Sequence, residues 1–267
     1  MSMFTLSKNV KYREEKESVF IADCKNLRDF KVNKEFLPFF GMLRKGLAEK
    51  GIANKREKLL FNDLKKMRLL APLQFNNIHP GNYAVVKDFL QRNLYLEYPG
   101  LKSRGFELLL HKLKECPEFF IGLYLSKDLI GVIQGFPRDD YLLMSEIAIE
   151  KKFRSRDFGE LLAAEFERRA RKKGFKKIKA GAQDKAIDFY KRIKYKPSVL
   201  VQIKKRDAPA NLAKLLKKYK ILAKVQDSKN ILVLELACPK STPRSLLKKL
   251  EKEFNAFSTQ YIFTKNL

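Results

Sequence analysis

The chain has 267 residues, 45% of them hydrophobic, and carries a formal net charge of +27. That hydrophobic share excludes a disordered tail protein, and no apolar run reaches the roughly 18 residues of a membrane span. The three cysteines are widely scattered and odd in number, which favours free thiols over a disulfide framework. Neither the cysteines nor the two histidines have the spacing of metal ligands, so we predict no metal site. We therefore expect a soluble, cytoplasmic protein without a metal.

The positive charge extends over the whole chain, and its excess per residue is highest near the C-terminal end. Such an excess attracts polyanions: nucleic acid, acidic protein surfaces or an anionic cofactor. A lysine-rich solvated surface accounts for the same composition. Charge alone therefore leaves a nucleic-acid partner, an acidic partner and a purely solvated surface open.

Residues 1–70 predict a small antiparallel sheet followed by two helices. Three short runs alternate apolar and polar residues, as strands do: 9–13, 18–23 and 27–32. Asn33 is placed to cap the first helix, and the second covers about residues 55–68. The dipeptide Ala71-Pro72 then ends the helical pattern and marks a domain boundary.

This order of elements resembles the PqqD-like domain, a small winged-helix-like module. The residues that carry the resemblance are Val10, Arg13, Glu15, Asp23, Leu27, Asn33, Leu64, Leu69 and Leu70. The resemblance implies a module that binds a peptide at the edge of its sheet, whereas a winged helix places a helix in a DNA groove. The mixed charges of the second helix are typical of a solvated face. A docking role, peptide binding and DNA binding all stay open.

Residues 71–204 predict a strand, two helices, three antiparallel strands, and then helix, strand, helix and strand. The expected ranges are 73–77, 80–94, 103–114, 118–125, 129–136, 142–149, 158–173, 176–180, 184–193 and 199–203. Gly174 is a natural end for the longest of these helices, because glycine adopts the left-handed conformation that closes a helix.

A short basic loop separates the strand that ends at Ile149 from the helix that begins at Phe158. Unpaired N–H groups and the helix dipole favour an anion at a helix N-terminus. Cations such as Arg154 and Arg156 are unfavourable at the positive end of the helix dipole unless an anion lies between the arginines and the helix. Gly159 has no Cβ to keep a diphosphate away. The loop therefore predicts a phosphate site.

The stretch from Ser145 to Tyr190 resembles the core of the GNAT acyl-CoA N-acyltransferase superfamily. The family's loop pattern is Gln/Arg-x-x-Gly-x-Gly/Ala, and its second signature is approximately Asn-x-x-Ala-x-x-Phe-Tyr-x-x-x-Gly-Phe. The matching residues are Arg154, Gly159, Ala186, Phe189 and Tyr190. Asp157 stands at a glycine position, Gln183 at the asparagine, and Lys194-Tyr195 at the Gly-Phe. The carboxylate of Asp157 would oppose a diphosphate unless it turns away or caps the helix.

The resemblance implies an α+β fold with a GNAT-like mixed central sheet and flanking helices. It also implies transfer of an acyl group, typically acetyl, from acetyl-CoA or another acyl-CoA to a primary amine. Tyr190 would be the acid for the leaving thiolate and Glu146 the base, acting directly or through water. The cofactor-binding residues would be Ile147, Ala148, Ile149, Arg154, Ser155, Arg156, Asp157, Phe158, Gly159, Glu160, Gln183 and Tyr190. Candidates for the acceptor pocket are Tyr95, Tyr98, Tyr124 and Phe136.

Residues 205–267, with the strand at 199–203, predict the order β-α-β-β-α-β of a ferredoxin-like module. A turn is expected at 227–230. Lysines line its helices, so RNA, a protein partner and an oligomer interface are alternatives. The expected organisation is thus 1–70, 71–204 and 205–267.

Two classes of function remain open on the sequence alone. One is an N-acyltransferase whose flanking modules present an acceptor, which is a small molecule, a peptide or a protein. The other is a non-catalytic GNAT-like scaffold that docks a peptide or a nucleic acid. The acceptor, the acyl group and the oligomeric state are not determined by the sequence.

Overall fold

The structure, a computed structural model, describes residues 3–97, 106–226, 230–239 and 241–267. The chain forms two compact units, each made of two segments. Unit 1 comprises residues 1–134 and 146–166, and unit 2 comprises residues 135–145 and 167–267. Tyr98, the first turn of the helix expected at 103–114, and most of the turn expected at 227–230 lie outside the described residues.

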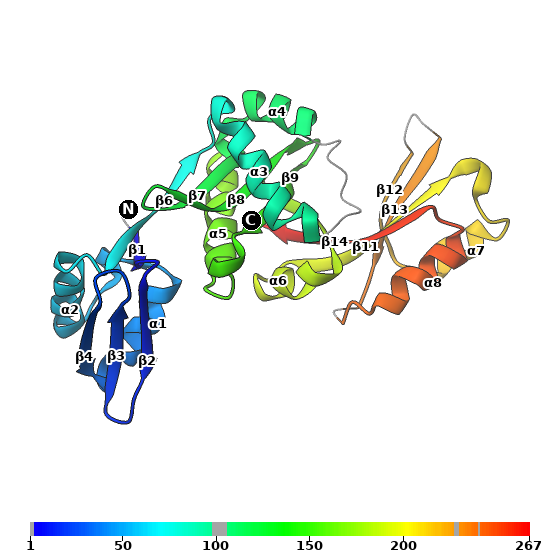
Figure 1. The fold of residues 1–267 in the computed structure, drawn as a ribbon. Helices are drawn as coiled ribbons and strands as arrows, with labels where there is room; N and C mark the ends of the chain where they lie inside the picture. The colour runs from blue at the N-terminus through cyan, green and yellow to red at the C-terminus, as the bar shows by residue number, and fades with distance from the viewer. Residues whose placement is uncertain (1–2, 98–105, 227–229, 240) are drawn as a thin grey trace. The chain divides into compact units, whose positions relative to one another are not determined.

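Unit 1 contains most of the elements expected before residue 128, and Figure 1 shows their course. Its elements are β1 (Met3–Leu6), β2 (Val10–Glu14), β3 (Ser18–Asp23), β4 (Arg28–Asn33), α1 (Leu37–Lys45), β5 (Leu47–Ala48), α2 (Lys55–Lys66), β6 (Leu70–Asn77), α3 (Tyr83–Asn93), α4 (Phe106–Glu115) and β7 (Phe120–Leu125). Three elements continue from one unit into the other: β8 (Asp128–Arg138), β9 (Tyr141–Ile149) and α5 (Phe158–Lys172).

Unit 2 contains the elements that follow α5. They are β10 (Lys177–Ala182), α6 (Ile187–Arg192), β11 (Lys196–Lys204), α7 (Leu212–Lys218), β12 (Ile221–Gln226), β13 (Ile231–Ala237), α8 (Arg244–Phe254) and β14 (Ser258–Asn266). The order of elements from β6 to β11 is the one that the sequence predicts. Among the described residues, no helix combines the length and the apolar composition that crossing a bilayer requires.

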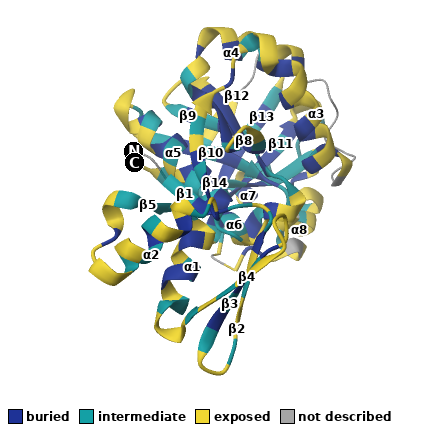
Figure 2. Cartoon of the chain, turned by 60° about the vertical axis from the view of Figure 1, so that its left-hand side comes forward, coloured by how far each residue is buried: buried dark blue, intermediate teal, exposed yellow. Residues whose placement is uncertain are grey.

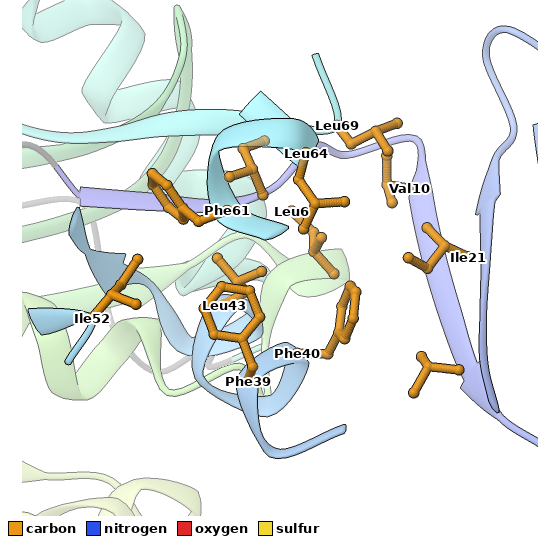
Figure 3. Close-up of a cluster of buried hydrophobic side chains, with 12 residues drawn as sticks. Leu6, Val10, Ile21, Phe39, Phe40, Leu43, Ile52, Phe61, Leu64 and Leu69 are labelled. Atoms are coloured by element: carbon orange, nitrogen blue, oxygen red, sulfur yellow. The ribbon is translucent and has the colours of Figure 1, made fainter. Parts of the chain in front are cut away.

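The first part of unit 1 is a three-stranded antiparallel sheet, β2-β3-β4, that packs against α1 and α2. Phe39 and Phe40 of α1 meet Phe61 of α2 in one buried cluster, which Figure 3 shows between the helices and Ile21 of β3. Burying a side chain of this size stabilises the fold by about 1.5–3 kcal/mol. The amphipathic spacing of these aromatic residues therefore accounts for the two helices.

Asn33 caps the chain where β4 turns into the helices, as predicted. Its side-chain oxygen accepts a hydrogen bond of 2.9 Å from the backbone N–H of Glu35. The capped turn is a short 3-10 helix, residues Lys34–Phe36, which leads directly into α1. The helical pattern has ended before Ala71 and Pro72, as predicted, but both residues lie inside β6, which begins earlier than the strand expected at 73–77. Proline is tolerated in a strand where the ladder does not need its missing N–H.

The strands of unit 1 outside that small sheet follow the order β5-β1-β6-β7-β8. β1 pairs antiparallel with β6, with Phe4 opposite Pro72. β6, β7 and β8 are antiparallel neighbours, and β7 with β8 is the hairpin that the turn at 126–128 predicts. Helices of this unit bury one face and expose the other, as Figure 2 shows for α2 and α4.

Unit 2 is built on the strand order β9-β10-β14-β11-β13-β12. β10 is parallel to β9 over residues 142–144 and 178–180, whereas the other pairs are antiparallel. The last strand, β14, lies between β10 and β11 and joins the C-terminal elements to β10 in one sheet. α8 packs on β14 and β11. Gly174 ends α5 with a φ of 83°, as predicted.

Candidate active site

Glu146, the predicted base, lies near the end of β9 at the centre of a buried polar cluster in unit 1. The hydroxyl of Tyr95 donates a hydrogen bond to Glu146 Oε1, and the side-chain amide of Gln134 donates one to Oε2. Tyr95 follows α3, and Gln134 belongs to β8, the strand before β9. Both carboxylate oxygens are thus held by neutral donors. This arrangement fixes the orientation of the carboxylate without neutralising its charge.

Burial raises the pKa of Glu146 above the ordinary range of a carboxyl group, and the hydrogen bonds from Tyr95 and Gln134 only partly oppose that rise. The phenols of Tyr83 and Tyr95 have raised pKa values, first because they are buried and then because Glu146 is negative. They therefore stay protonated at neutral pH. A carboxylate with a raised pKa is suited to accepting a proton near neutrality.

Gln134 and Tyr83 are members of this cluster that the sequence analysis missed. Gln134 is fully buried within β8, where its neighbours are apolar, and Tyr83 begins α3 and is 5% exposed. Gln134 Oε1 and the Tyr83 hydroxyl have no partner in hydrogen-bond geometry among the described residues. The sequence does contain a signal for Gln134, since it is the single amide in an otherwise apolar strand. A buried polar group needs a hydrogen-bond partner, so this amide indicates a second polar group nearby.

The loop between β9 and α5 contains two residues in the left-handed conformation, Ser155 with φ 61° and Asp157 with φ 58°. Aspartate tolerates this conformation better than most residues, although glycine favours it most. Asp157 therefore keeps the backbone geometry of the glycine whose position it occupies in the loop pattern. Its backbone carbonyl accepts hydrogen bonds from the N–H groups of Glu160 and Leu161, at 2.9 and 3.1 Å, and so begins α5.

The side chain of Asp157 is paired with a lysine from α1. Lys45 Nζ lies 2.9 Å from Asp157 Oδ2. The sequence left two possibilities, a carboxylate that turns away and one that caps the helix. The contact that the structure shows is an ion pair that neutralises the carboxylate.

The two arginines of the loop have different surroundings. Arg154 donates hydrogen bonds to the backbone carbonyls of Asn93, at 2.7 Å, and Ile149, at 3.1 Å, and thereby ties the loop to α3 and β9. Arg156 stacks on the ring of Phe153, with 5.4 Å between its Cζ and the ring centroid. Burial and the nearby Arg44 lower the pKa of Arg156. Within the described ranges, no ion pair joins Arg156 to a carboxylate.

The other predicted cofactor residues fall into three groups. Ala148 and Phe158 are buried, so that only their backbone atoms are available to a ligand. Ile147, Ser155, Gly159 and Glu160 are partly or fully exposed around the start of α5. Gln183 belongs to unit 2, where its carbonyl accepts a 2.8 Å hydrogen bond from the N–H of Ala186.

Tyr190, the predicted acid, lies in the core of unit 2. Its ring stacks on Phe263 at 5.2 Å between centroids, and its hydroxyl lies 3.9 Å from Met144 Sδ. Burial raises the pKa of Tyr190, so the phenol holds its proton at neutral pH. Glu146 and Tyr190 belong to different units. The structure therefore groups Glu146 with Tyr95, Gln134 and the loop, and describes Tyr190 in a separate environment.

The candidates for the acceptor pocket are dispersed. Tyr95 contacts Glu146, as described above, whereas Phe136 is buried in unit 2. The ring of Tyr124 fills the space beside Gly122, where an added Cβ would lie 2.6 Å from the ring. Of the described candidates, Tyr95 is the one that contacts the predicted base through a hydrogen bond.

A family comparison covers this part of the chain. Residues 86–195 match the acetyltransferase (GNAT) family. No curated protein matches the chain. The matched segment runs from α3 to Tyr195 and includes Glu146, the loop before α5 and Tyr190. This part of the chain is thus similar to a GNAT acetyltransferase domain, whereas β2-β3-β4 and the strands from β11 onward lie outside the match.

Solved GNAT structures resemble the chain at low sequence identity. The PaiA N-acetyltransferase from Thermoplasma acidophilum, in complex with coenzyme A, is 12% identical with a TM-score of 0.42, over 62% of this chain and 99% of that one. A GNAT family acetyltransferase from Elizabethkingia anophelis with acetyl-CoA bound is 13% identical with a TM-score of 0.42, over 73% and 98%. Ard1 from Thermoplasma volcanium is 15% identical with a TM-score of 0.40, over 62% and 99%.

Unit 2 also contains an open groove of about 1230 Å³ over its sheet. Its basic lining residues are Arg138, Lys177, Lys179, Lys194, Lys196 and Lys265. Three of these lysines have acidic partners, because Lys177 pairs with Asp140 at 2.8 Å, Lys179 with Glu235 at 2.5 Å and Lys265 with Glu167 at 2.8 Å. The groove is therefore basic in balance and partly neutralised.

Proposed function

We propose that the chain is an N-acetyltransferase that moves an acetyl group from acetyl-CoA to a primary amine, with Glu146 as general base. The observation that carries this proposal is the partly buried carboxylate of Glu146, held by Tyr95 and Gln134 on the strand that leads into the phosphate loop. The GNAT match over the same residues supports the reaction class. The amine acceptor is a small molecule, a peptide or a protein.

The residues of the loop fit an acyl-CoA. Ser155 and Asp157 give it a left-handed path, Arg156 has no carboxylate partner in the described part of the chain, and Asp157 is already paired with Lys45. The Asp157 carbonyl accepts hydrogen bonds from the N–H groups of Glu160 and Leu161, and the dipole of α5 favours an anion at this end of the helix. We assign the diphosphate to the loop 154–159 and the amide-rich arm to the backbone of 147–149. When bound, acetyl-CoA supplies the thioester carbon that the amine attacks.

Glu146 has the central role in proton transfer. A primary amine is largely protonated at neutral pH, because an unperturbed alkylammonium has a pKa of about 10.4. Glu146 removes that proton, directly or through water, and its raised pKa brings its affinity for the proton closer to that of the amine. Tyr95 and Gln134 hold the carboxylate in one orientation. For the departing thiolate we propose Tyr190 as the proton donor, as the GNAT resemblance implies, because its phenol keeps its proton at neutral pH.

Isothermal titration with acetyl-CoA tests the cofactor half of this proposal. We expect saturable binding by the wild-type chain and about tenfold weaker binding by Arg156→Ala, because one charge beside the diphosphate is lost. Arg206→Ala is the matched control, since it removes one exposed arginine from unit 2 outside the GNAT match. Absence of saturable binding at millimolar acetyl-CoA would overturn the proposal, as would equal effects of the two variants.

The groove of unit 2 favours a second candidate, the docking of a nucleic acid by a non-catalytic scaffold. Arg138, Lys194 and Lys196 line it without an ion pair to a described carboxylate. If this function applies, a labelled single-stranded RNA binds with a steep salt dependence. Lys194→Glu with Lys196→Glu then weakens binding by about tenfold, while Lys214→Glu with Lys217→Glu on α7 has a smaller effect. Binding that both pairs weaken equally reflects general charge and counts against the groove.

The flanking parts of the chain have proposed roles beside the GNAT domain. The sheet β2-β3-β4 has two outer strands, β2 and β4, and the order sheet then helices supports a PqqD-like module that adds a partner peptide to an edge. The antiparallel order β12-β13-β11-β14 with α7 and α8 supports a ferredoxin-like arrangement. Both modules would serve to present an acceptor to the transferase domain.

A further inference from the structure

The last turn of α1 lies directly against the first turn of α5. Gly46, which follows α1, has a φ of 95°, and a Cβ added there would lie 3.1 Å from Leu161 Cδ1 and 3.1 Å from Leu73 Cδ2. Leu161 belongs to the first turn of α5, the helix that follows the phosphate loop. The end of α1 is therefore in close contact with the helix that follows the loop, although α1 lies outside the segment that matches the GNAT family.

Two cations at the end of α1 reach the loop through this contact. Lys45 Nζ lies 2.9 Å from Asp157 Oδ2, and the side chains are 64% and 31% exposed. Arg44, the residue before it, lies near enough to Arg156 to lower the pKa of that guanidinium. The last turn of α1 thus meets the one carboxylate that replaces a glycine in the loop pattern.

An aspartate at this position is unfavourable for a diphosphate ligand unless its charge is compensated. A carboxylate and a phosphate a few ångströms apart repel each other, because both are negatively charged and a protein surface screens the repulsion less than bulk water does. The backbone at Asp157 already has the left-handed geometry that a glycine would give it. The remaining difference from the family pattern is therefore the charge and the position of one carboxylate.

We propose that Lys45 is a positioning residue of the acyl-CoA site, which holds and neutralises Asp157 so that the loop receives the diphosphate of the cofactor. This inference rests on the proposed acetyl-CoA binding. It makes the N-terminal part of the chain a component of the cofactor site rather than only an appended module. A single lysine outside the GNAT match then compensates for a single departure from the loop pattern inside it.

A double-mutant cycle tests this role directly. Acetyl-CoA affinity is measured by titration for the wild type, Lys45→Ala, Asp157→Gly and the double variant. Lys45→Ala is expected to weaken binding about tenfold, because Asp157 loses its counter-charge. Asp157→Gly is expected to bind more tightly than the wild type. In the Asp157→Gly background, Lys45→Ala is expected to change the affinity less than twofold, because there is no carboxylate left to hold.

Three further measurements separate positioning from other roles of Lys45. S-acetylpantetheine, which lacks the diphosphate, should bind the wild type and Lys45→Ala equally. Lys45→Arg should restore most of the affinity, because it restores the counter-charge. Lys34→Ala is the matched control, since Lys34 forms a similar exposed ion pair with Glu14 at 2.7 Å in the same unit. It should leave acetyl-CoA affinity unchanged.

The outcomes distinguish this inference from the proposed function. If the wild type shows no saturable acetyl-CoA binding, the proposed function fails. If the wild type binds and Lys45→Ala weakens binding equally in the wild-type and Asp157→Gly backgrounds, Lys45 acts on the cofactor independently of Asp157 and the inference is overturned. It is also overturned if Lys45→Ala lowers only the melting temperature, because a lysine at the C-terminal end of α1 stabilises the helix dipole in any case.

Discussion

Glu146→Gln is expected to lower kcat by about 10²–10³-fold, the range in which a lost general base falls, while the Kd for acetyl-CoA stays within twofold of the wild-type value. The substitution keeps the size of the side chain but removes its ability to accept a proton. The rate of transfer is measured with a panel of primary amines as acceptors, by following the release of the CoA thiol. Glu150→Gln is the matched control, because Glu150 is partly exposed beyond the end of the same strand.

The pH dependence of the wild type gives a second readout of the same residue. Glu146 accepts a proton only when it is ionised, so kcat/KM is expected to fall as the pH decreases through the raised pKa of Glu146. That decrease should begin at a higher pH than for an ordinary carboxyl group and should be absent from the residual activity of Glu146→Gln. An unchanged acid limb in the variant would contradict the assignment of the base.

Thermal unfolding of Glu146→Gln shows whether the variant is folded and tests the cause of the pKa shift. The folded-state pKa of Glu146 is raised, so its full contribution to the free energy of unfolding is present at pH values below the unfolded carboxyl pKa. The wild type loses that contribution as the pH rises through the folded pKa, because a charge must then be buried. The melting temperature of the variant should therefore rise relative to that of the wild type as the pH increases from below the ordinary carboxyl pKa of about 4.3 through the raised folded pKa of Glu146.

The parts of the fold that the sequence predicted are those that depend on local spacing. The apolar stripe with Phe39 and Phe40, the cap at Asn33 and the helix end at Gly174 each involve residues within a few positions of one another. The element order from β6 to β11 follows from the same local patterns. Pairings between distant segments, such as β1 with β6 and β14 between β10 and β11, leave no such pattern and were not predicted.

The candidate site divides in the same way. The loop 154–159 and Glu146 were found because they follow one another in the chain and match a family pattern. Gln134, Tyr83 and Lys45 come from other elements, and their roles depend on contacts made only in the folded chain. Lys45 and Asp157 illustrate the reason, since neither residue alone indicates a partner in a distant part of the chain. A surface lysine is ordinary, and an aspartate before a helix is ordinary as well.

Tyr190→Phe is expected to lower kcat by about 10²-fold and to leave acetyl-CoA binding within twofold, because it removes the proton destined for the leaving sulfur and, besides that, only the 3.9 Å contact of the hydroxyl with Met144 Sδ. The ring of phenylalanine preserves the stacking on Phe263 at 5.2 Å, so the core of unit 2 should be retained. The measurements are steady-state transfer to the amine panel and titration with acetyl-CoA. The raised pKa of the phenol predicts that the wild-type acid stays protonated throughout the neutral range.

Tyr195→Phe is the control that separates catalysis from packing. Tyr195 is 3% exposed, lies 5.8 Å from Tyr190 between ring centroids, and has a hydroxyl buried in the same core. Removing its hydroxyl therefore perturbs the same packing without touching the proposed acid. A decrease in kcat confined to Tyr190→Phe assigns the proton to Tyr190. Equal decreases in both variants make the pair structural. An unchanged kcat in Tyr190→Phe makes Tyr190 a core aromatic, so that another group or water must protonate the departing thiolate.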